Sequence, residues 1–236
     1  MANKKNKLYV IDGNSLLHRA WHAIPPLTTK DGTLVNAAYG FSVVLEKMME
    51  EHKPTHLAVC WDVVGGTFRD DIFDSYKAGR QEKAQELYDQ IDIIYDILDA
   101  HGIPAFGIEG YEADDLLGTI AEHERKNPDT ETIIITGDLD ALQLVDELTK
   151  VLVFIKGFSV TKTYDIEAVK ERYGFGPEHI VDYKSLKGDS SDNIPGVKGI
   201  GDKGATELIQ KFGGLDDIYK ALDAGKLADE FKPGLI

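Results

Sequence analysis

An α/β fold built on a parallel sheet is the fold class that this sequence predicts. Three short apolar runs, Lys7–Ile11, His56–Trp61 and Thr132–Thr136, have the composition of strands that are buried on both faces. The segments between these runs carry apolar residues at helical spacing. Strands that alternate with helices form parallel sheets, because each helix returns the chain to the edge where the previous strand began.

The helices are predicted by apolar residues that recur every three or four positions. In chain order they cover Asn14–His22, Asn36–His52, Leu87–Leu98, Glu112–Arg125, Asp165–Tyr173 and Pro177–Leu186. Asn14 or Ser15 would cap the first helix, which Pro25 must end. Further strands are expected at Ile103–Ile108 and, as a β-hairpin about Lys156-Gly157, at Val151–Ile155 and Ser159–Thr163.

The composition is that of a cytoplasmic globular protein. A chain of 236 residues can bury a sizeable core, and no apolar run approaches the ~20 residues of a membrane span. The basic N-terminal tail lacks the apolar segment of a signal peptide, and the one cysteine, Cys60, excludes an internal disulfide. The net charge of −15 argues against a nucleic-acid partner unless metal ions offset part of it.

Carboxylates follow the predicted strands closely. Asp12, Asp62 and Asp138 each lie directly after a strand or within two residues of its end. In open α/β sheets the carboxyl ends of the strands meet at one edge, which is where ligands bind. We therefore expect these three side chains to share a cleft.

Further acidic residues occur in closely spaced groups. Glu112 and Asp115 lie three residues apart at the start of a helix and so share one face, while Asp114 points to the side. Asp140 follows Asp138 by two residues. The pair Asp189 and Asp192 repeats the three-residue spacing.

A divalent metal site is the interpretation that accounts for the whole set. Like charges in one cleft would raise one another's pKa values unless cations are present. Oxygen ligands favour Mg²⁺ or Mn²⁺, and two such ions about 3.5–4 Å apart support phosphodiester hydrolysis. For any single aspartate, a turn or cap role is an equal alternative. For the set, that alternative is poor.

Several motifs occur in an order that is typical of one family. They are Val10–Ser15, Tyr39-Gly40, Phe68–Asp70, Tyr76–Arg80, Gly110–Asp115, Thr136–Asp140 and Gly188–Gly201. Together they resemble the 5′-nuclease domain of bacterial DNA polymerase I, a member of the flap endonuclease family. The resemblance covers nearly the whole chain. It implies a PIN-like, parallel-sheet nuclease core (residues 1–174) with a helical arch (about 67–86), and a helix–hairpin–helix DNA-binding subdomain (residues 175–236).

The resemblance assigns ligands for two Mg²⁺ or Mn²⁺ ions, held directly or through water. All nine acidic positions of the family motif are filled: Asp12, Asp62, Glu112, Asp114, Asp115, Asp138, Asp140, Asp189 and Asp192. It also places Lys77 and Arg80 in the arch over the scissile phosphate. Without the motif, a solvated helix face would be the better interpretation of these two cations.

A glycine-rich hairpin before a helix is predicted to bind the DNA backbone without reading sequence. The residues concerned are Gly196, Lys198, Gly199, Gly201 and Lys203. The alternative is a glycine-rich turn without a ligand. By resemblance the hairpin also holds a K⁺ ion, and His18 and Tyr76 contact DNA near the cleavage site.

The function implied is that of a structure-specific 5′ nuclease, with 5′→3′ exonuclease and flap endonuclease activity, that removes primers and flaps in replication and repair. DNA with 5′ flaps or 5′ ends is the expected partner, a DNA polymerase is a candidate partner, and the chain is expected to be monomeric. Two alternatives are a PIN-type ribonuclease and a non-catalytic DNA-binding module with a structural metal site.

Overall fold

Two compact units make up the computed structural model, which describes residues 5–79 and 84–225. Unit 1 comprises residues 5–68 and 84–165, and unit 2 comprises residues 69–79 and 166–225. Segment 69–79, which belongs to the predicted arch, thus groups with the C-terminal residues. The predicted division of the chain near residue 174 stays a prediction. It assigned segment 69–79 to the first domain, whereas the structure groups this segment with unit 2.

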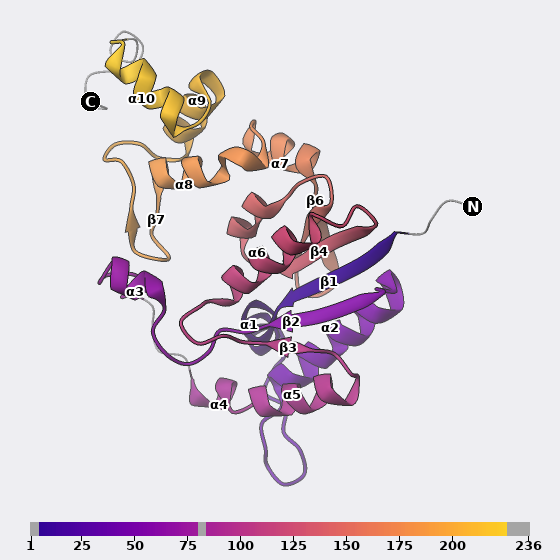
Figure 1. Cartoon of the computed structure of the whole chain (residues 1–236). Coiled ribbons are helices and arrows are strands. Elements are labelled where there is room, and N and C mark those ends of the chain that lie inside the picture. The colour runs from indigo at the N-terminus through magenta and orange to yellow at the C-terminus, as the bar shows by residue number, and fades with distance from the viewer. Residues whose placement is uncertain (1–4, 80–83, 226–236) are drawn as a thin grey trace. The chain divides into compact units, whose positions relative to one another are not determined.

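A six-stranded sheet forms the centre of unit 1, in the order β3-β2-β1-β4-β5-β6 (Figure 1). All neighbouring strands are parallel except β5 and β6, which form the predicted antiparallel hairpin. The strands are β1 (Asn6–Asp12), β2 (His56–Cys60), β3 (Ala105–Phe106), β4 (Thr130–Thr136), β5 (Thr149–Lys156) and β6 (Val160–Tyr164). The predicted parallel α/β core is confirmed.

The order in which the chain adds strands to the sheet changes side at β1, so a topological switch point lies between β1 and β4. From β1 the chain adds β2 and then β3 on one side, and it then crosses to place β4 on the other side of β1. Ile11 is paired with Ile135, so the next residues, Asp12 and Thr136, end their strands side by side. Such a switch point is where open α/β sheets bind their ligands.

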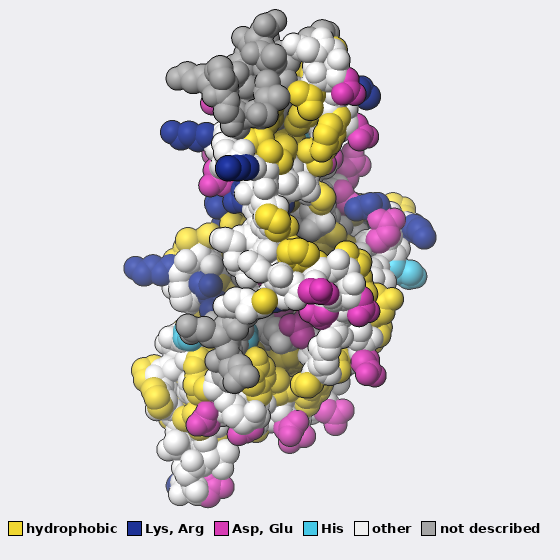
Figure 2. Space-filling view, turned by 90° about the vertical axis from the view of Figure 1, so that its left-hand side faces the viewer, with side chains coloured by type: hydrophobic (Ala, Val, Ile, Leu, Met, Phe, Trp, Pro, Cys, Tyr) yellow, Lys and Arg dark blue, Asp and Glu magenta, His cyan; other side chains and the backbone are white. Residues whose placement is uncertain are grey.

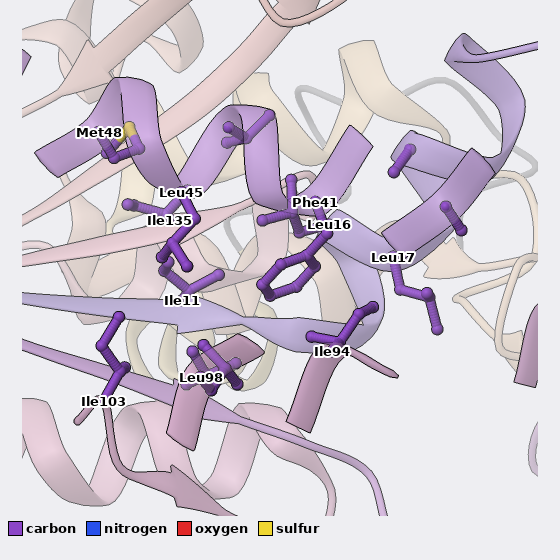
Figure 3. Packing of buried hydrophobic residues seen from close by; sticks show 14 of the residues in the cluster. Ile11, Leu16, Leu17, Phe41, Leu45, Met48, Ile94, Leu98, Ile103 and Ile135 are labelled. Atoms are coloured by element: carbon purple, nitrogen blue, oxygen red, sulfur yellow. The ribbon is translucent and has the colours of Figure 1, made fainter. Parts of the chain in front are cut away.

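Helices cover both faces of this sheet (Figure 1). One face carries α1 (Gly13–Ala23), α2 (Asn36–His52) and α5 (Ile91–Ala100), and α6 (Ala113–Glu124) packs on the other against β1, β2 and β4. The main core lies on the first face, where Phe41 and Leu45 of α2 meet Ile11 and Ile135 of the sheet (Figure 3). A short 3₁₀ helix, η1 (Leu139–Leu144), follows β4.

The predicted helix over Leu87–Leu98 is wrong in one respect, because the structure has two helices there. α4 (Gln85–Tyr88) ends before α5 begins, and Gln90 lies in the break. The Gln90 side chain is buried, and its Oε1 accepts hydrogen bonds from the backbone N–H groups of Ala37 and Ala38 in the first turn of α2. The break therefore supplies acceptors that α2 lacks at its own N-terminus.

Two other boundaries differ from the predictions. The strand expected over Ile103–Ile108 shortens to the two residues of β3 at the edge of the sheet. An added Cβ at Gly107 would lie 2.8 Å from the Val63 side chain, so the chain leaves the sheet here in close contact with the loop after β2. The first helix is capped by Asp12 rather than by Asn14 or Ser15.

Unit 2 is helical. It contains α3 from Arg69 onward (the helix spans Phe68–Ile72), α7 (Ile166–Tyr173), the 3₁₀ helix η2 (Pro177–His179), α8 (Ile180–Lys187), α9 (Asp202–Phe212) and α10 (Leu215–Asp223). A two-stranded antiparallel ribbon, β7 (Gly188–Asp189) with β8 (Ile194–Pro195), follows α8. α8 packs on α9, and α9 on α10, so the turn before α9 joins two packed helices as the predicted hairpin requires.

None of the helices among the described residues combines the length and apolar character needed to cross a membrane. Acidic side chains lie scattered over the face shown in Figure 2, and the Lys and Arg side chains lie mostly in its upper half.

Candidate active site

Asp12 lies at the centre of the candidate site, where β1 passes into α1. Its Oδ1 accepts a hydrogen bond from Ser15 N at 2.9 Å, and its Oδ2 accepts one from Thr136 Oγ1 at 2.7 Å. Only 6 % of the residue is exposed. Burial raises the pKa of Asp12 to about 6, against these hydrogen bonds, and the charges of Asp62 and Asp138 raise it further. A buried carboxyl of this kind favours a cation beside it.

Asp138 and Asp62 are also held by backbone contacts. Asp138 Oδ1 accepts a hydrogen bond from Asp140 N at 2.8 Å and caps η1. Asp62 Oδ1 accepts one from Ala113 N at 2.7 Å, which ties the loop after β2 to the first residue of α6. These carboxylates therefore act as caps and at the same time raise the pKa of Asp12. A role of Asp62 and Asp138 as helix caps therefore does not exclude a role as metal ligands.

The N-terminus of α6 carries Glu112 and Asp115 in a reciprocal capping box. Glu112 is buried, and Asp115 Oδ2 accepts a hydrogen bond from Glu112 N at 2.9 Å. The predicted direction of Asp114, to the side of the helix face that Glu112 and Asp115 share, stays a prediction. Asp114 keeps solvent-exposed surface. Its pKa is nevertheless raised to about 7, first by desolvation and then by the negative charges of its neighbours, which are Asp12, Asp138, Asp62 and Glu112. Asp114 therefore lies close enough to the strand-end carboxylates for their charges to act on its pKa.

The donor set of unit 1 fits a hard divalent cation. The charged groups that raise the pKa values of Asp12 and Asp114 are all carboxylates, which are the ligands that such a cation prefers. Cys60, which pairs with Asp12 across β1 and β2, has its pKa raised to about 12 by burial and by Asp12, so its thiol stays protonated. Among the residues that the structure describes, no three His, Cys, Asp or Glu side chains form a ready-made metal-binding group. Ions held partly through water allow wider carboxylate spacing.

Two glycines allow the close packing that positions the strand-end carboxylates. An added Cβ at Gly13 would lie 2.5 Å from the ring of Trp61, which precedes Asp62. An added Cβ at Gly137 would lie 2.8 Å from Ser15 Oγ, and Gly137 N donates a hydrogen bond to that oxygen at 2.6 Å. Any side chain at either position would displace the segment that carries Asp12, Asp62 or Asp138.

Sequence reasoning did not predict three polar residues that hold the site. Thr136 donates to Asp12 and accepts from Asp138 N, and Ser15 joins α1 to the loop after β4. Asn14 Oδ1 accepts a hydrogen bond from Asp62 N at 3.0 Å. All three lie inside the motifs Val10–Ser15 and Thr136–Asp140, and this position was the signal that could have identified them.

In unit 2, Asp189 is paired with a cation of its own chain. Its Oδ2 accepts a hydrogen bond from Lys184 Nζ at 2.7 Å, and its Oδ1 accepts one from Ser191 N at 2.8 Å. Partial burial raises the pKa of Asp189, but the contacts with Lys184 and Ser191 outweigh burial and hold it well below its usual range. Asp189 is thus ionised and paired with Lys184.

The predicted arch residues lie next to Asp192. Lys77 N donates to the Asp192 carbonyl oxygen at 3.0 Å, and Tyr76 Oη lies 3.5 Å from Asp192 Oδ2. The Lys77 ammonium is 4.8 Å from the centroid of the Tyr76 ring. Arg80, the second predicted catalytic cation, lies outside the described residues.

The hairpin at residues 196–201 requires glycine for two different reasons, a positive φ and close backbone packing. Gly201 has nothing within 4 Å of an added Cβ and lies directly before α9, whose N-terminus has no side-chain cap. Gly199 has a φ of 88°, which favours glycine. Gly196, in contrast, packs against the backbone, because an added Cβ would lie 2.2 Å from the Lys187 carbonyl carbon. Lys198 and Lys203 are exposed, and their contacts with phosphate stay predictions.

His18 lies on α1 in unit 1 and is half-buried. Its ring meets the edge of Tyr88 from α4, with the ring centroids 6.4 Å apart. The predicted contact between His18 and a DNA base stays a prediction.

Comparison with known proteins assigns the chain to a family. Residues 7–174 match the model of the 5′-3′ exonuclease N-terminal resolvase-like domain, and residues 175–234 match that of the 5′-3′ exonuclease C-terminal SAM fold. The chain therefore belongs to the 5′-3′ exonuclease family, which confirms the resemblance drawn from its motifs.

The similar proteins include bacterial DNA polymerases and a phage nuclease. The chain is 43 % identical to DNA polymerase I of Bacillus subtilis over 220 residues, which is 93 % of this chain and 25 % of that protein. It is 44 % identical to DNA polymerase I of Caldicellulosiruptor bescii over 219 residues, which is 92 % of this chain and 26 % of that protein. The chain thus spans about a quarter of the length of these relatives.

The fold is shared with the flap endonuclease of bacteriophage T5, solved as a pseudo-enzyme–product complex with DNA and metal ions. The TM-score is 0.77 at 22 % identity, and the alignment covers 92 % of this chain and 79 % of the phage protein.

Proposed function

We propose that the chain is a structure-specific 5′ nuclease that hydrolyses DNA phosphodiesters, with 5′→3′ exonuclease and flap endonuclease activity. The observation that carries the proposal is the set of carboxylates at the switch point between β1 and β4, in a chain of the 5′-3′ exonuclease family. The pKa values of Asp12 and Asp114 are raised by burial and by neighbouring carboxylates, so a cation between these groups would favour their ionised forms.

Mg²⁺ or Mn²⁺ is the cofactor that this donor set suits. The predicted ligands of the two ions, held directly or through water, are Asp12, Asp62, Glu112, Asp114, Asp115, Asp138 and Asp140 in unit 1. By family resemblance, Asp189 and Asp192 in unit 2 belong to the same set of ligands. When bound, the ions would lower the pKa of an attacking water and offset charge on the leaving oxygen.

The protein's own residues would orient the substrate. Lys77 and Arg80 would stabilise negative charge on the phosphate that is being transferred. Gly199, Gly201 and the amides at the start of α9 would contact the DNA backbone, with added charge from Lys198 and Lys203. Because none of these groups reads a base edge, binding would be independent of sequence.

The same proposal includes an ion at the hairpin, the partners, the location and the domain division. A K⁺ ion would lie at the glycine hairpin, with the backbone carbonyl oxygens as its ligands. DNA with 5′ flaps or 5′ ends would be the partner of a monomeric, cytoplasmic protein, and a DNA polymerase could act with it. The division into a nuclease core over residues 1–174 and a DNA-binding subdomain over 175–236 is supported by the two matched segments.

A comparison of three labelled substrates tests the proposal. We expect the protein with Mg²⁺ to cleave a 5′-flap duplex faster than a flush duplex, to leave single-stranded RNA uncut, and to be inactive in EDTA. Preference for the RNA would favour a PIN-type ribonuclease. DNA binding without cleavage in Mg²⁺ or Mn²⁺ would favour a binding module with a structural metal site.

A further inference from the structure

Unit 2 joins two segments that lie more than a hundred residues apart in sequence. Asn193 Nδ2 donates a hydrogen bond to the Ser75 carbonyl oxygen at 2.8 Å. Two residues after Ser75 and one residue before Asn193, Lys77 N donates to the Asp192 carbonyl oxygen at 3.0 Å. The segment that carries Lys77 is therefore bonded to the loop that carries Asp192 through both a side chain and the backbone.

The backbone at this junction is unusual on both sides. The described residues contain three non-glycine residues with positive φ, and two of them are Lys77 at 54° and Asn193 at 59°. Lysine seldom adopts this left-handed conformation, whereas asparagine tolerates it. A conformation that the local sequence disfavours persists where surrounding contacts fix it, and such positions cluster at functional sites.

Tyr76 adds a third contact between the two segments. Its hydroxyl lies 3.5 Å from Asp192 Oδ2, and its ring lies under the Lys77 ammonium. Lys77 and Tyr76 are thus both tied to the loop that carries Asp192.

We propose that Asn193 is a positioning residue that fixes the Lys77 segment to the Asp189–Asp192 loop. This inference rests on the proposed function for its effect on cleavage. Asn193 contacts neither phosphate nor metal in the proposed chemistry. It acts through Lys77, by holding Ser75 and thereby the turn that ends in the left-handed Lys77.

Asn193→Asp is the informative change. Aspartate also tolerates positive φ and matches asparagine in size, but it cannot donate to the Ser75 carbonyl oxygen. Asn127→Asp is the matched control, because Asn127 makes similar amide contacts with Glu124 and Thr130 at a turn of unit 1. Asn193→Gly separates the two roles, because it keeps the backbone conformation and removes the amide.

Single-turnover cleavage of a 5′-flap duplex in Mg²⁺ gives the first readout. We expect Asn193→Asp and Asn193→Gly to lower the cleavage rate by about tenfold or more, with the DNA Kd changed by less than about threefold. In a Lys77→Ala background, Asn193→Asp should have little further effect, because the residue acts through Lys77. Losses that simply multiply in the double variant, or a loss confined to Kd, would overturn the proposal.

Trypsin supplies a readout that needs no catalytic activity. Cleavage after Lys77 should be faster in Asn193→Asp than in the wild type and the Asn127→Asp control, at equal circular dichroism. If the wild type cleaves no DNA, the proposed function fails while this result still tests the junction. Equal trypsin rates in all three proteins would overturn the inference.

Discussion

The raised pKa of Asp12 makes the stability of unit 1 depend on pH in a way that a metal ion should abolish. Its folded-state pKa of about 6 lies above the value of 3.8 expected without burial. The folded state therefore holds the proton more tightly than the unfolded state. The resulting stabilisation is complete below about pH 4 and is lost as the pH rises through 6.

The size of this effect follows from the two pKa values. A rise from 3.8 to about 6 corresponds to about 3 kcal/mol in all. About 1.4 kcal/mol of this would be lost between pH 5 and pH 8, which is equivalent to a fall of several degrees in Tm for a chain of this size. Asp114, with its pKa raised to about 7, acts in the same direction.

Tryptophan fluorescence can follow this unit alone, because Trp21 and Trp61 are the two tryptophans of the sequence and both lie in unit 1. In EDTA we expect the Tm to fall from pH 5 to pH 8, and to fall less in Asp12→Asn. The His101 imidazole, whose pKa is raised by hydrogen bonds to Ile97 and Glu46, titrates in both proteins and cancels in the comparison.

Saturating Mg²⁺ should flatten the pH dependence of the wild type and raise its Tm at pH 8. Binding at about 100 times the Kd would add about 2.7 kcal/mol. Equal pH slopes for wild type and Asp12→Asn in EDTA would refute the reasoning about the buried carboxyl. An equal effect of Mg²⁺ on both proteins would refute the assignment of the ion to this site.

Three further predictions concern the scaffold and the DNA contacts. Gly13→Ala should lower the stability of unit 1 by about 1–3 kcal/mol in urea unfolding, because the added Cβ would meet the indole ring of Trp61. Gly118→Ala in α6 should be neutral or stabilising, and equal effects of the two changes would contradict the packing argument. Gln90→Ala should lower the free energy of unfolding by about 2–3 kcal/mol, because two buried backbone N–H groups lose their acceptor. The same change at the exposed Gln85 should alter it by less than about 0.5 kcal/mol, and similar values for the two variants would count against the role of the Gln90 hydrogen bonds. Lys203→Ala should weaken binding of any DNA sequence and lower the slope of log Kd against log salt by about 1, and an unchanged slope would exclude a phosphate contact.

The sequence predicted the core of the fold because its strands are buried on both faces. Apolar runs such as Thr132–Thr136 have few alternatives to a central parallel strand, and the structure places them there. The break at Gln90 could not be predicted, because its cause is a contact with α2 more than fifty residues away. Edge strands such as β3 are poorly predicted for a related reason, since one neighbour decides their length.

For the candidate site, residue types were predictable and their contacts were not. The strand-end position of Asp12 follows from sequence alone, and its role as the cap of α1 does not. The reciprocal hydrogen bonds between Glu112 and Asp115 also do not follow from spacing, which places the two residues on one face but does not specify a capping box. The contact between Asn193 and Ser75 joins two loops, and no periodic pattern marks it.

The central claim is that the carboxylates at the β1–β4 switch point form the metal-dependent centre of a 5′ nuclease. The most direct test is the single-turnover cleavage rate of a labelled 5′-flap duplex by the wild type and by Asp138→Ala, each in Mg²⁺ and at matched DNA occupancy. We predict that the wild type releases the flap and leaves a 5′-phosphate, and that Asp138→Ala is slower by about 100-fold or more while still binding the duplex. Undiminished cleavage by Asp138→Ala would contradict the account.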